Sequence, residues 1–304
     1  MKELLEEILK TCAPYSKEGS VATYIPELRK ADPEAFGIYI ISKDGKESFA
    51  GDYNKPFTVQ SIVKPVILLE ALLDNGIEAV GRLSGVEATG KPFDAFNYSD
   101  RALTSEHINP MINAGAIALS TLIAGESFEE KFSRLLALMR RLALDPTLSV
   151  NEAVYLSEKA TGNKNRALAY MLKAYGMIDC DIEDVLDLYF KACSIEVTCK
   201  DLANIAYVLA NHGVAPSGER LLPREYARYV NAIMAICGMY DGSGDFALKV
   251  GVPAKSGVGG GIMAAVPQKM GIGIFSPALD KKGNSIAGIK ALELLSQKLE
   301  LSIF

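Results

Sequence analysis

The chain has 304 residues, a net charge of −5, 49% hydrophobic residues, no Trp and only two His. This composition indicates a globular protein of about two domains and excludes the disordered and fibrous classes. Because His107 and His212 are the only histidines, a zinc enzyme of the HExxH type is excluded, and a Ser-His-Asp triad would have to use one of them.

The charge pattern argues against nucleic acid and membrane partners. A phosphate backbone needs a basic face, and basic side chains here never run longer than a pair such as Arg140-Arg141. The N-terminal stretch MKELLEEILK mixes Glu with apolar residues, so we expect an amphipathic helix and no signal peptide. No uninterrupted apolar run approaches the ~18 residues of a membrane span. Cysteines without CxxC spacing predict buried free thiols, and the expected location is cytoplasmic.

The first elements after this helix are strands. Phe36–Ile41 is a short apolar run, and Lys43-Asp44-Gly45-Lys46 predicts a turn into a second strand at Ser48–Ala50. From about 61 to 240 the spacing of apolar residues is helical. One such helix holds Val66, Leu69 and Leu73, and we expect it to end at Asn75-Gly76.

The C-terminal part returns to strand patterns. Ala254–Val258, Gly261–Val266 and Gly271–Phe275 predict three strands, the first two joined by Gly259-Gly260. A last amphipathic helix follows Asn284-Ser285. Strands at both ends and helices between them predict an α+β protein whose two ends share one antiparallel sheet.

This pattern also predicts the domain organisation. Residues 1–60 and 241–304 form a discontinuous α/β sheet domain, and residues 61–240 form a helical domain. A junction between two such domains is a common place for a small-molecule site, so we expect the active site in the cleft between them.

The first chemical motif is Ser61-Ile62-Val63-Lys64. On a helix, residues three apart share a face, so Lys64 can reach the Ser61 hydroxyl. Pro65 fits only a first helical turn, which places Ser61 at a helix N-terminus, where the helix dipole favours a neutral amine. A neutral lysine could remove the serine proton without histidine. With 21 Ser and 22 Lys, about 1.5 such spacings are expected by chance, so the motif alone is weak.

The second motif is Lys255-Ser256-Gly257 on a late predicted strand, which chance produces about 0.2 times in this composition. A SxxK motif, then a helical domain, then K-S-G is the order found in serine β-lactamases and penicillin-binding proteins. Their Ser-Asp-Asn motif is absent, and Tyr229-Val230-Asn231 lies in an amphipathic stretch where core packing is expected.

Six longer blocks make the resemblance specific, and they follow one another along nearly the whole chain: FTVQSIVKP (57–65), INPMINAGAI (108–117), SEKATGNKN (157–165), LYFKACS (188–194), GMYDGSG (238–244) and PAKSGVGGGIMAAVP (253–267). These blocks resemble those of the serine-dependent glutaminases, in the bacterial short form. The resemblance implies a β-lactamase-like fold and hydrolysis of L-glutamine to L-glutamate and ammonia. It implies no cofactor and no metal.

The resemblance also implies roles for single residues. Ser61 matches the family nucleophile, Lys64 its activating base, and Tyr189 a tyrosine that carries a proton to the departing ammonia. The N–H of Val258 would complete an oxyanion hole with that of Ser61. The expected substrate contacts are Tyr24, Asn113, Glu158, Asn165, Tyr240 and Val258.

The chemistry of glutamine agrees with these residues. Glu158 is the natural counter-charge for the α-ammonium group of the substrate. Asn113, Asn165 and the tyrosine hydroxyls can hold the α-carboxylate or the amide. No arginine is implied, so neutral donors would bind the carboxylate.

Three alternatives remain open from the sequence. One is a penicillin-recognising hydrolase or peptidase of the same superfamily. Another is a non-catalytic module that binds glutamine or a protein partner. Nucleotide binding through GVGGG is the weakest, because no Gly-Lys-Ser/Thr follows it. The resemblance further predicts a homodimer or homotetramer.

Overall fold

The computed structural model describes residues 1–90, 92, 94 and 104–304. Its central feature is a five-stranded antiparallel sheet of order β2-β1-β7-β6-β5. The strands are β1 (Gly37–Ser42), β2 (Glu47–Gly51), β5 (Ala254–Ser256), β6 (Gly261–Val266) and β7 (Met270–Phe275). The predicted α+β class is therefore confirmed. The strand predicted over Ala254–Val258 is shorter than expected, because the chain turns at Gly257–Gly260 toward β6.

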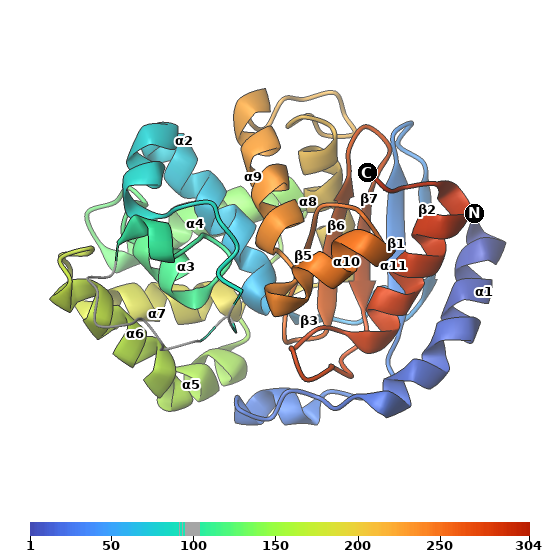
Figure 1. The fold of residues 1–304 in the computed structure, drawn as a ribbon, viewed down its shortest axis with the longest axis horizontal. Coiled ribbons are helices and arrows are strands. Elements are labelled where there is room, and N and C mark those ends of the chain that lie inside the picture. The colour runs from blue at the N-terminus through green and yellow to red at the C-terminus, as the bar shows by residue number, and fades with distance from the viewer. Residues whose placement is uncertain (91, 93, 95–103) are drawn as a thin grey trace.

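Strands from the two ends of the chain lie side by side in this sheet. Gly37 of β1 pairs with Phe275 of β7, and Ile41 pairs with Gly271, in antiparallel register. This register confirms the expectation that both chain ends contribute to one sheet. Both termini accordingly lie in the sheet half of the molecule (Figure 1).

The alternation of residues along the strands gives the sheet two buried faces. Ile38, Ile40, Ile272 and Ile274 pack into a hydrophobic cluster on one face. Helices α1 (Lys2–Cys12) and α11 (Ile286–Leu299) cover this face and contact each other. The N-terminal amphipathic helix predicted from MKELLEEILK is confirmed, with Leu5, Ile8 and Cys12 as its buried residues.

The opposite face of the sheet is covered by α8 (Cys199–Ala210), which contacts β1, β6 and β7. Two glycines of β7 allow this helix to lie directly on the strand. A Cβ at Gly273 would come within 2.0 Å of the Cys199 carbonyl oxygen, and one at Gly271 within 2.2 Å of that of Ala203. The apolar run GIGIF therefore has large side chains on one face and space for a helix on the other.

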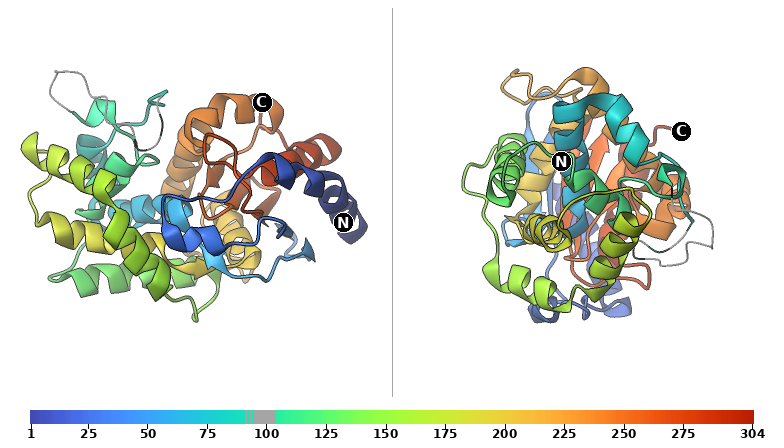
Figure 2. Two further views of the ribbon diagram at one scale, coloured as in Figure 1. Left: turned by 90° about the horizontal axis from the view of Figure 1, so that it is seen from below. Right: turned by 90° about the vertical axis from the view of Figure 1, so that its left-hand side faces the viewer.

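The remaining helices form a second group beside the sheet (Figures 1 and 2). They are α2 (Lys64–Leu83), α3 (Asn113–Ser120), α4 (Phe128–Ala143), α5 (Glu152–Thr161), α6 (Asn163–Ala174), α7 (Ile182–Cys193) and α9 (Arg224–Cys237). Helix α10 (Ser243–Lys249) instead lies beside α11 on the sheet, where Phe246 joins the cluster on the first face (Figure 1). A small two-stranded sheet joins β3 (Phe57–Thr58) to β4 (Glu196–Val197). None of the helices within the described ranges is long and apolar enough to cross a membrane.

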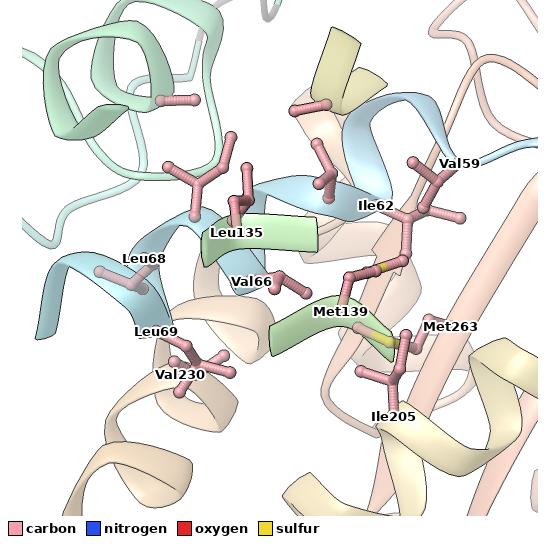
Figure 3. Packing of buried hydrophobic residues seen from close by; sticks show 14 of the residues in the cluster. Val59, Ile62, Val66, Leu68, Leu69, Leu135, Met139, Ile205, Val230 and Met263 are labelled. Carbon is pink, nitrogen blue, oxygen red and sulfur yellow. The ribbon is translucent and has the colours of Figure 1, made fainter. Parts of the chain in front are cut away.

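Helix α2 is the centre of this group. Its buried residues pack against α3, α4 and α9, and Figure 3 shows Val66 near Met139 and Leu69 beside Val230. The first helical segment of α2 stops at Asn75-Gly76, as predicted. Gly76 breaks it with φ 78° and ψ 173°, a conformation open to glycine, and helical structure then resumes to Leu83.

Helix α8 belongs by sequence to the middle segment but lies on the sheet. The division into residues 1–60 with 241–304 and residues 61–240 stays a prediction. The cysteines are free, as expected, but Cys180 is only partly buried, since it lies in the loop just before α7. Asn231 donates from Nδ2 to the Leu209 carbonyl oxygen inside the core, as expected for a packing role.

Candidate active site

Ser61 lies in a short turn between β3 and α2. Residues Gln60–Val63 form a 3-10 turn, and the α-helix itself begins at Lys64. Ser61 therefore lies at the N-terminal end of this helical segment, as predicted, and the Lys64 N–H donates to the Ser61 carbonyl oxygen. Gln60 has a φ of +48°, which is uncommon for a residue with a side chain and is found where neighbours fix the backbone. Ser61 itself is 7% exposed.

The Lys64 amine is fully buried and has neutral partners. Its Nζ donates to Oδ1 of Asn113 at 2.7 Å and to the carbonyl oxygen of Met111 at 3.3 Å. Burial lowers the pKa of Lys64 to about 8, against weaker opposing effects of Cys193, Glu158 and Asp94. The structure thus moves this lysine toward the neutral form that a general base needs.

Asn113, at the start of α3, joins the lysine to two further site residues. Its Oδ1 also accepts a hydrogen bond from the Tyr189 hydroxyl at 3.3 Å. Its Nδ2 donates to Oδ1 of Asn165 at 2.8 Å. Asn113 is 7% exposed and Asn165 is 9% exposed, so this network lies at the boundary of the protein interior.

Glu158 on α5 is a buried carboxyl group with one oxygen unused. It accepts a hydrogen bond from Gln60, and Oε2 has no hydrogen-bond partner in the part of the chain that the structure describes. Burial raises the pKa of Glu158 to about 8, while Gln60 and Lys64 oppose the rise. Such an acceptor is costly to leave unpaired, and a cationic ligand group would relieve that cost.

Val258 lies beside the Ser61 turn because the loop that carries it has glycines on both sides. A Cβ at Gly257 would come within 2.8 Å of the Val59 carbonyl oxygen, and one at Gly259 within 2.5 Å of that of Thr58. The backbone of this loop therefore runs directly against residues 58–62. A side chain at either glycine would push the Val258 backbone away from Ser61.

Tyr240 lies next to the nucleophile. Burial raises the pKa of the Tyr240 phenol well above its ordinary range, and the nearby Ser61 hydroxyl opposes this rise. Tyr189 is bonded to Asn113 instead, and burial followed by the proximity of Cys193 raises its pKa. The resemblance gave Tyr189 the proton-carrying role and Tyr240 a substrate contact, but it did not predict their different hydrogen-bond partners.

Tyr24 is at the mouth of the site. It is 55% exposed and lines a cavity of about 370 Å³ together with Val258, Asp94 and Leu279. A larger cavity of about 990 Å³ lies between α2, α4 and α7 and is lined by none of the predicted site residues. The structure thus groups seven other predicted residues around Ser61 and leaves Tyr24 at the entrance.

Three residues near Ser61 had no role in the sequence prediction. Gln60 bonds Glu158, and its position directly before Ser61 in the FTVQSIVKP block was a usable signal. Cys193 lies one helical turn after Tyr189 and shares a hydrogen bond with it. Lys255, from the K-S-G motif, is fully buried beside Tyr240.

The sheet with its flanking helices and the buried Ser61–Lys64 pair define a serine hydrolase of the β-lactamase-like type. The glutaminase family model matches residues 19–304. The chain is 55% identical to the glutaminase of Clostridium tetani and 53% identical to glutaminase 2 of Clostridium perfringens, covering all of both chains. The chain belongs to the glutaminase family, which confirms the resemblance and the predicted enzyme, an amide hydrolase.

Solved structures agree with this assignment. A probable glutaminase from Bacillus subtilis, complexed with 6-diazo-5-oxo-L-norleucine, is 39% identical and matches with a TM-score of 0.91, covering all of this chain and 97% of that one. The glutamate form of a protein named Mglu is 39% identical and matches with a TM-score of 0.95, covering all of this chain and 69% of the other. The predicted β-lactamase-like fold is confirmed.

Proposed function

We propose that this chain hydrolyses L-glutamine to L-glutamate and ammonia at Ser61, through a covalent acyl-enzyme, with Lys64 as the base. The observation that carries the proposal is a fully buried lysine, one turn from a buried serine, whose pKa is lowered to about 8. At pH 7 roughly a tenth of such an amine is neutral, far more than for an exposed lysine.

In the first half of the reaction, the Ser61 oxygen attacks the side-chain amide carbon of glutamine, and its proton passes to the Lys64 amine. The N–H groups of Ser61 and Val258 are proposed to bind the oxyanion that develops, a kind of interaction worth ~3–4 kcal/mol per donor. The carbon–nitrogen bond then breaks, and the amide nitrogen takes up a proton and leaves as ammonia. An ester between the glutamyl group and Ser61 remains. In the second half, water attacks this ester and releases glutamate.

The substrate ends are assigned by charge. The unused Oε2 of Glu158 is suited to the α-ammonium group, which would favour the ionised carboxylate on binding. Asn165, with the Tyr24 and Tyr240 hydroxyls, would bind the α-carboxylate or the amide as neutral donors. Asn113 already bonds Lys64, Tyr189 and Asn165, so a substrate contact would be a fourth interaction of its amide.

The proton for the departing ammonia has two candidate carriers. The sequence prediction assigns this step to Tyr189. The proximity of the Tyr240 hydroxyl to Ser61 favours Tyr240 as a second candidate, because this hydroxyl would lie close to the bond that breaks. A cytoplasmic homodimer or homotetramer also stays a prediction.

The test is a substrate screen. Purified protein should release ammonia and glutamate from L-glutamine, and Ser61→Ala should abolish the release while leaving the thermal midpoint close to that of the wild type. Covalent labelling of Ser61 by a β-lactam, with glutamine untouched, would favour the penicillin-recognising alternative. Tight glutamine binding without turnover would favour the binding module.

A further inference from the structure

Lys255 on β5 is a second fully buried lysine that the proposed mechanism does not use. Its side chain is 0% exposed, and Nζ donates to the carbonyl oxygens of Gly238 at 3.0 Å and Ser256 at 2.7 Å. Among the residues that the structure describes it forms no ion pair with a carboxylate. A buried amine with only main-chain partners is costly, so its retention needs a local reason.

The third neighbour of the Lys255 amine is the ring of Tyr240. Nζ lies 4.3 Å from the ring centroid, within the range of amine–aromatic contacts. The two hydrogen bonds fix the amine against the main chain, and the ring packs against the fixed amine. Lys255 therefore contacts the ring of the tyrosine whose hydroxyl lies near Ser61.

The turn that carries Tyr240 is held by several other groups. Ser243 Oγ accepts from the Met239 N–H at 3.1 Å and donates to the Tyr240 carbonyl oxygen at 2.9 Å. Asn284 Nδ2 donates to the Met239 carbonyl oxygen at 3.3 Å. Tyr240 has a φ of +56°, a conformation that a residue with a side chain keeps only where its surroundings impose it.

Strand β5 touches this turn through its backbone. A Cβ at Gly238 would lie 1.7 Å from the Ala254 carbonyl oxygen, and the Ser256 N–H donates to the Gly238 carbonyl oxygen at 3.2 Å. Two residues after Ser256 comes Val258. The turn that carries Tyr240 and the strand that leads to Val258 thus meet at the Lys255 amine.

We propose that Lys255 is a positioning residue that holds the Tyr240 hydroxyl against Ser61, by binding the Gly238 carbonyl oxygen and supporting the Tyr240 ring. The proposal rests on the proposed function, because its consequence is measured in glutamine hydrolysis. It assigns no proton transfer to Lys255. Its effect passes through Tyr240 alone.

A double-mutant cycle tests this dependence. We expect Lys255→Met to lower kcat for glutamine about tenfold or more. In a Tyr240→Phe background, where no hydroxyl is left to position, the same change should alter kcat by less than about twofold. Equal fold-losses in both backgrounds would show a general structural effect and overturn the proposal. An unchanged kcat in Lys255→Met or in Tyr240→Phe alone would also overturn it.

Ser243→Ala gives an independent arm that does not depend on how Lys255→Met folds. It loosens the same turn, so its loss of kcat should likewise vanish in the Tyr240→Phe background, and a loss that persists there would contradict the proposal. Lys249→Met is the matched control, because Lys249 is exposed on α10 and pairs with the exposed Asp245; its kcat should equal that of the wild type. An inactive wild type would refute the proposed function, whereas an active wild type with an additive cycle would refute only the role of Lys255.

Discussion

The Nζ atom of Lys64 lies 2.7 Å from Oδ1 of Asn113, and both side chains are buried. An amide oxygen accepts a hydrogen bond from the amine without bringing a negative charge to it. A carboxylate in the same place would hold the lysine as an ammonium ion, which cannot accept the proton of Ser61. The neutral partner is therefore what allows burial to lower the pKa of Lys64 to about 8.

This relationship predicts the effect of Asn113→Asp. The new carboxylate should raise the pKa of Lys64, so kcat/KM would reach its plateau at a pH at least ~1 unit higher than in the wild type. At pH 7 the activity should fall about tenfold or more. The measurement is the pH profile of glutamine hydrolysis. A loss of activity with the wild-type profile would limit Asn113 to contacting substrate.

In the wild type, kcat/KM should rise with pH through about 8, because Lys64 acts only when it is deprotonated. Lys64→Ala should lose at least ~10³-fold in kcat, the scale of removing a member of a catalytic set. His107→Ala and His212→Ala should stay within about threefold of wild type, since neither histidine belongs to the Ser61 site. An activity loss in a histidine variant comparable to that of Lys64→Ala would contradict a lysine-based mechanism.

Substitution by phenylalanine should distinguish the roles of Tyr240 and Tyr189. If Tyr240 supplies the leaving-group proton, Tyr240→Phe should lower kcat about 10²-fold or more, within the range of general acid catalysis. Tyr189→Phe removes the hydrogen bond to Asn113, and we expect a loss of most activity if its hydroxyl carries the proton. Single-turnover kinetics separate acylation from deacylation in both variants. An unchanged kcat for either variant would remove that tyrosine from the proton path.

Glu158→Gln should raise the stability of the fold and weaken glutamine binding. The pKa of Glu158 is raised from 4.5 to about 8, so between these values the unfolded chain ionises and the folded chain does not. The resulting destabilisation is absent near pH 4, grows as the pH rises, and is complete above about 8. We therefore expect the free energy of unfolding of the variant to exceed that of the wild type by ~1–3 kcal/mol at pH 8 and to match it near pH 4.

The same substitution should raise KM for glutamine at least tenfold, because the counter-charge of the α-ammonium group is removed. Denaturant titrations at pH 4 and pH 8 and kinetics at pH 8 measure both effects. Asn165→Asp, on the neighbouring helix, is a control that adds a charge to the site in place of removing one. A stability gain independent of pH, or an unchanged KM, would contradict the proposed role of Glu158.

The Ser61–Lys64 pair and the order of strands and helices follow from the sequence alone. Ser61 and Lys64 are three residues apart, so a single local turn brings them together whatever surrounds it. Short apolar runs next to turn residues predicted the terminal strands, and helical spacing predicted the middle of the chain. The helix break at Gly76 was also predicted by its residues, although not the resumed turn beyond it.

What the tertiary structure decided depends on residues far apart in the chain. Packing of α3 against α2 brings Asn113 to Lys64, and burial there sets the protonation of the lysine. The Tyr240 turn meets Ser61, and Lys255 meets Tyr240, only because glycines let β5 and the following loop lie against neighbouring backbone. Motif spacing fixes which side chains can meet within one turn, whereas desolvation and long-range packing decide the partners and charge of each group, and no local pattern encodes these.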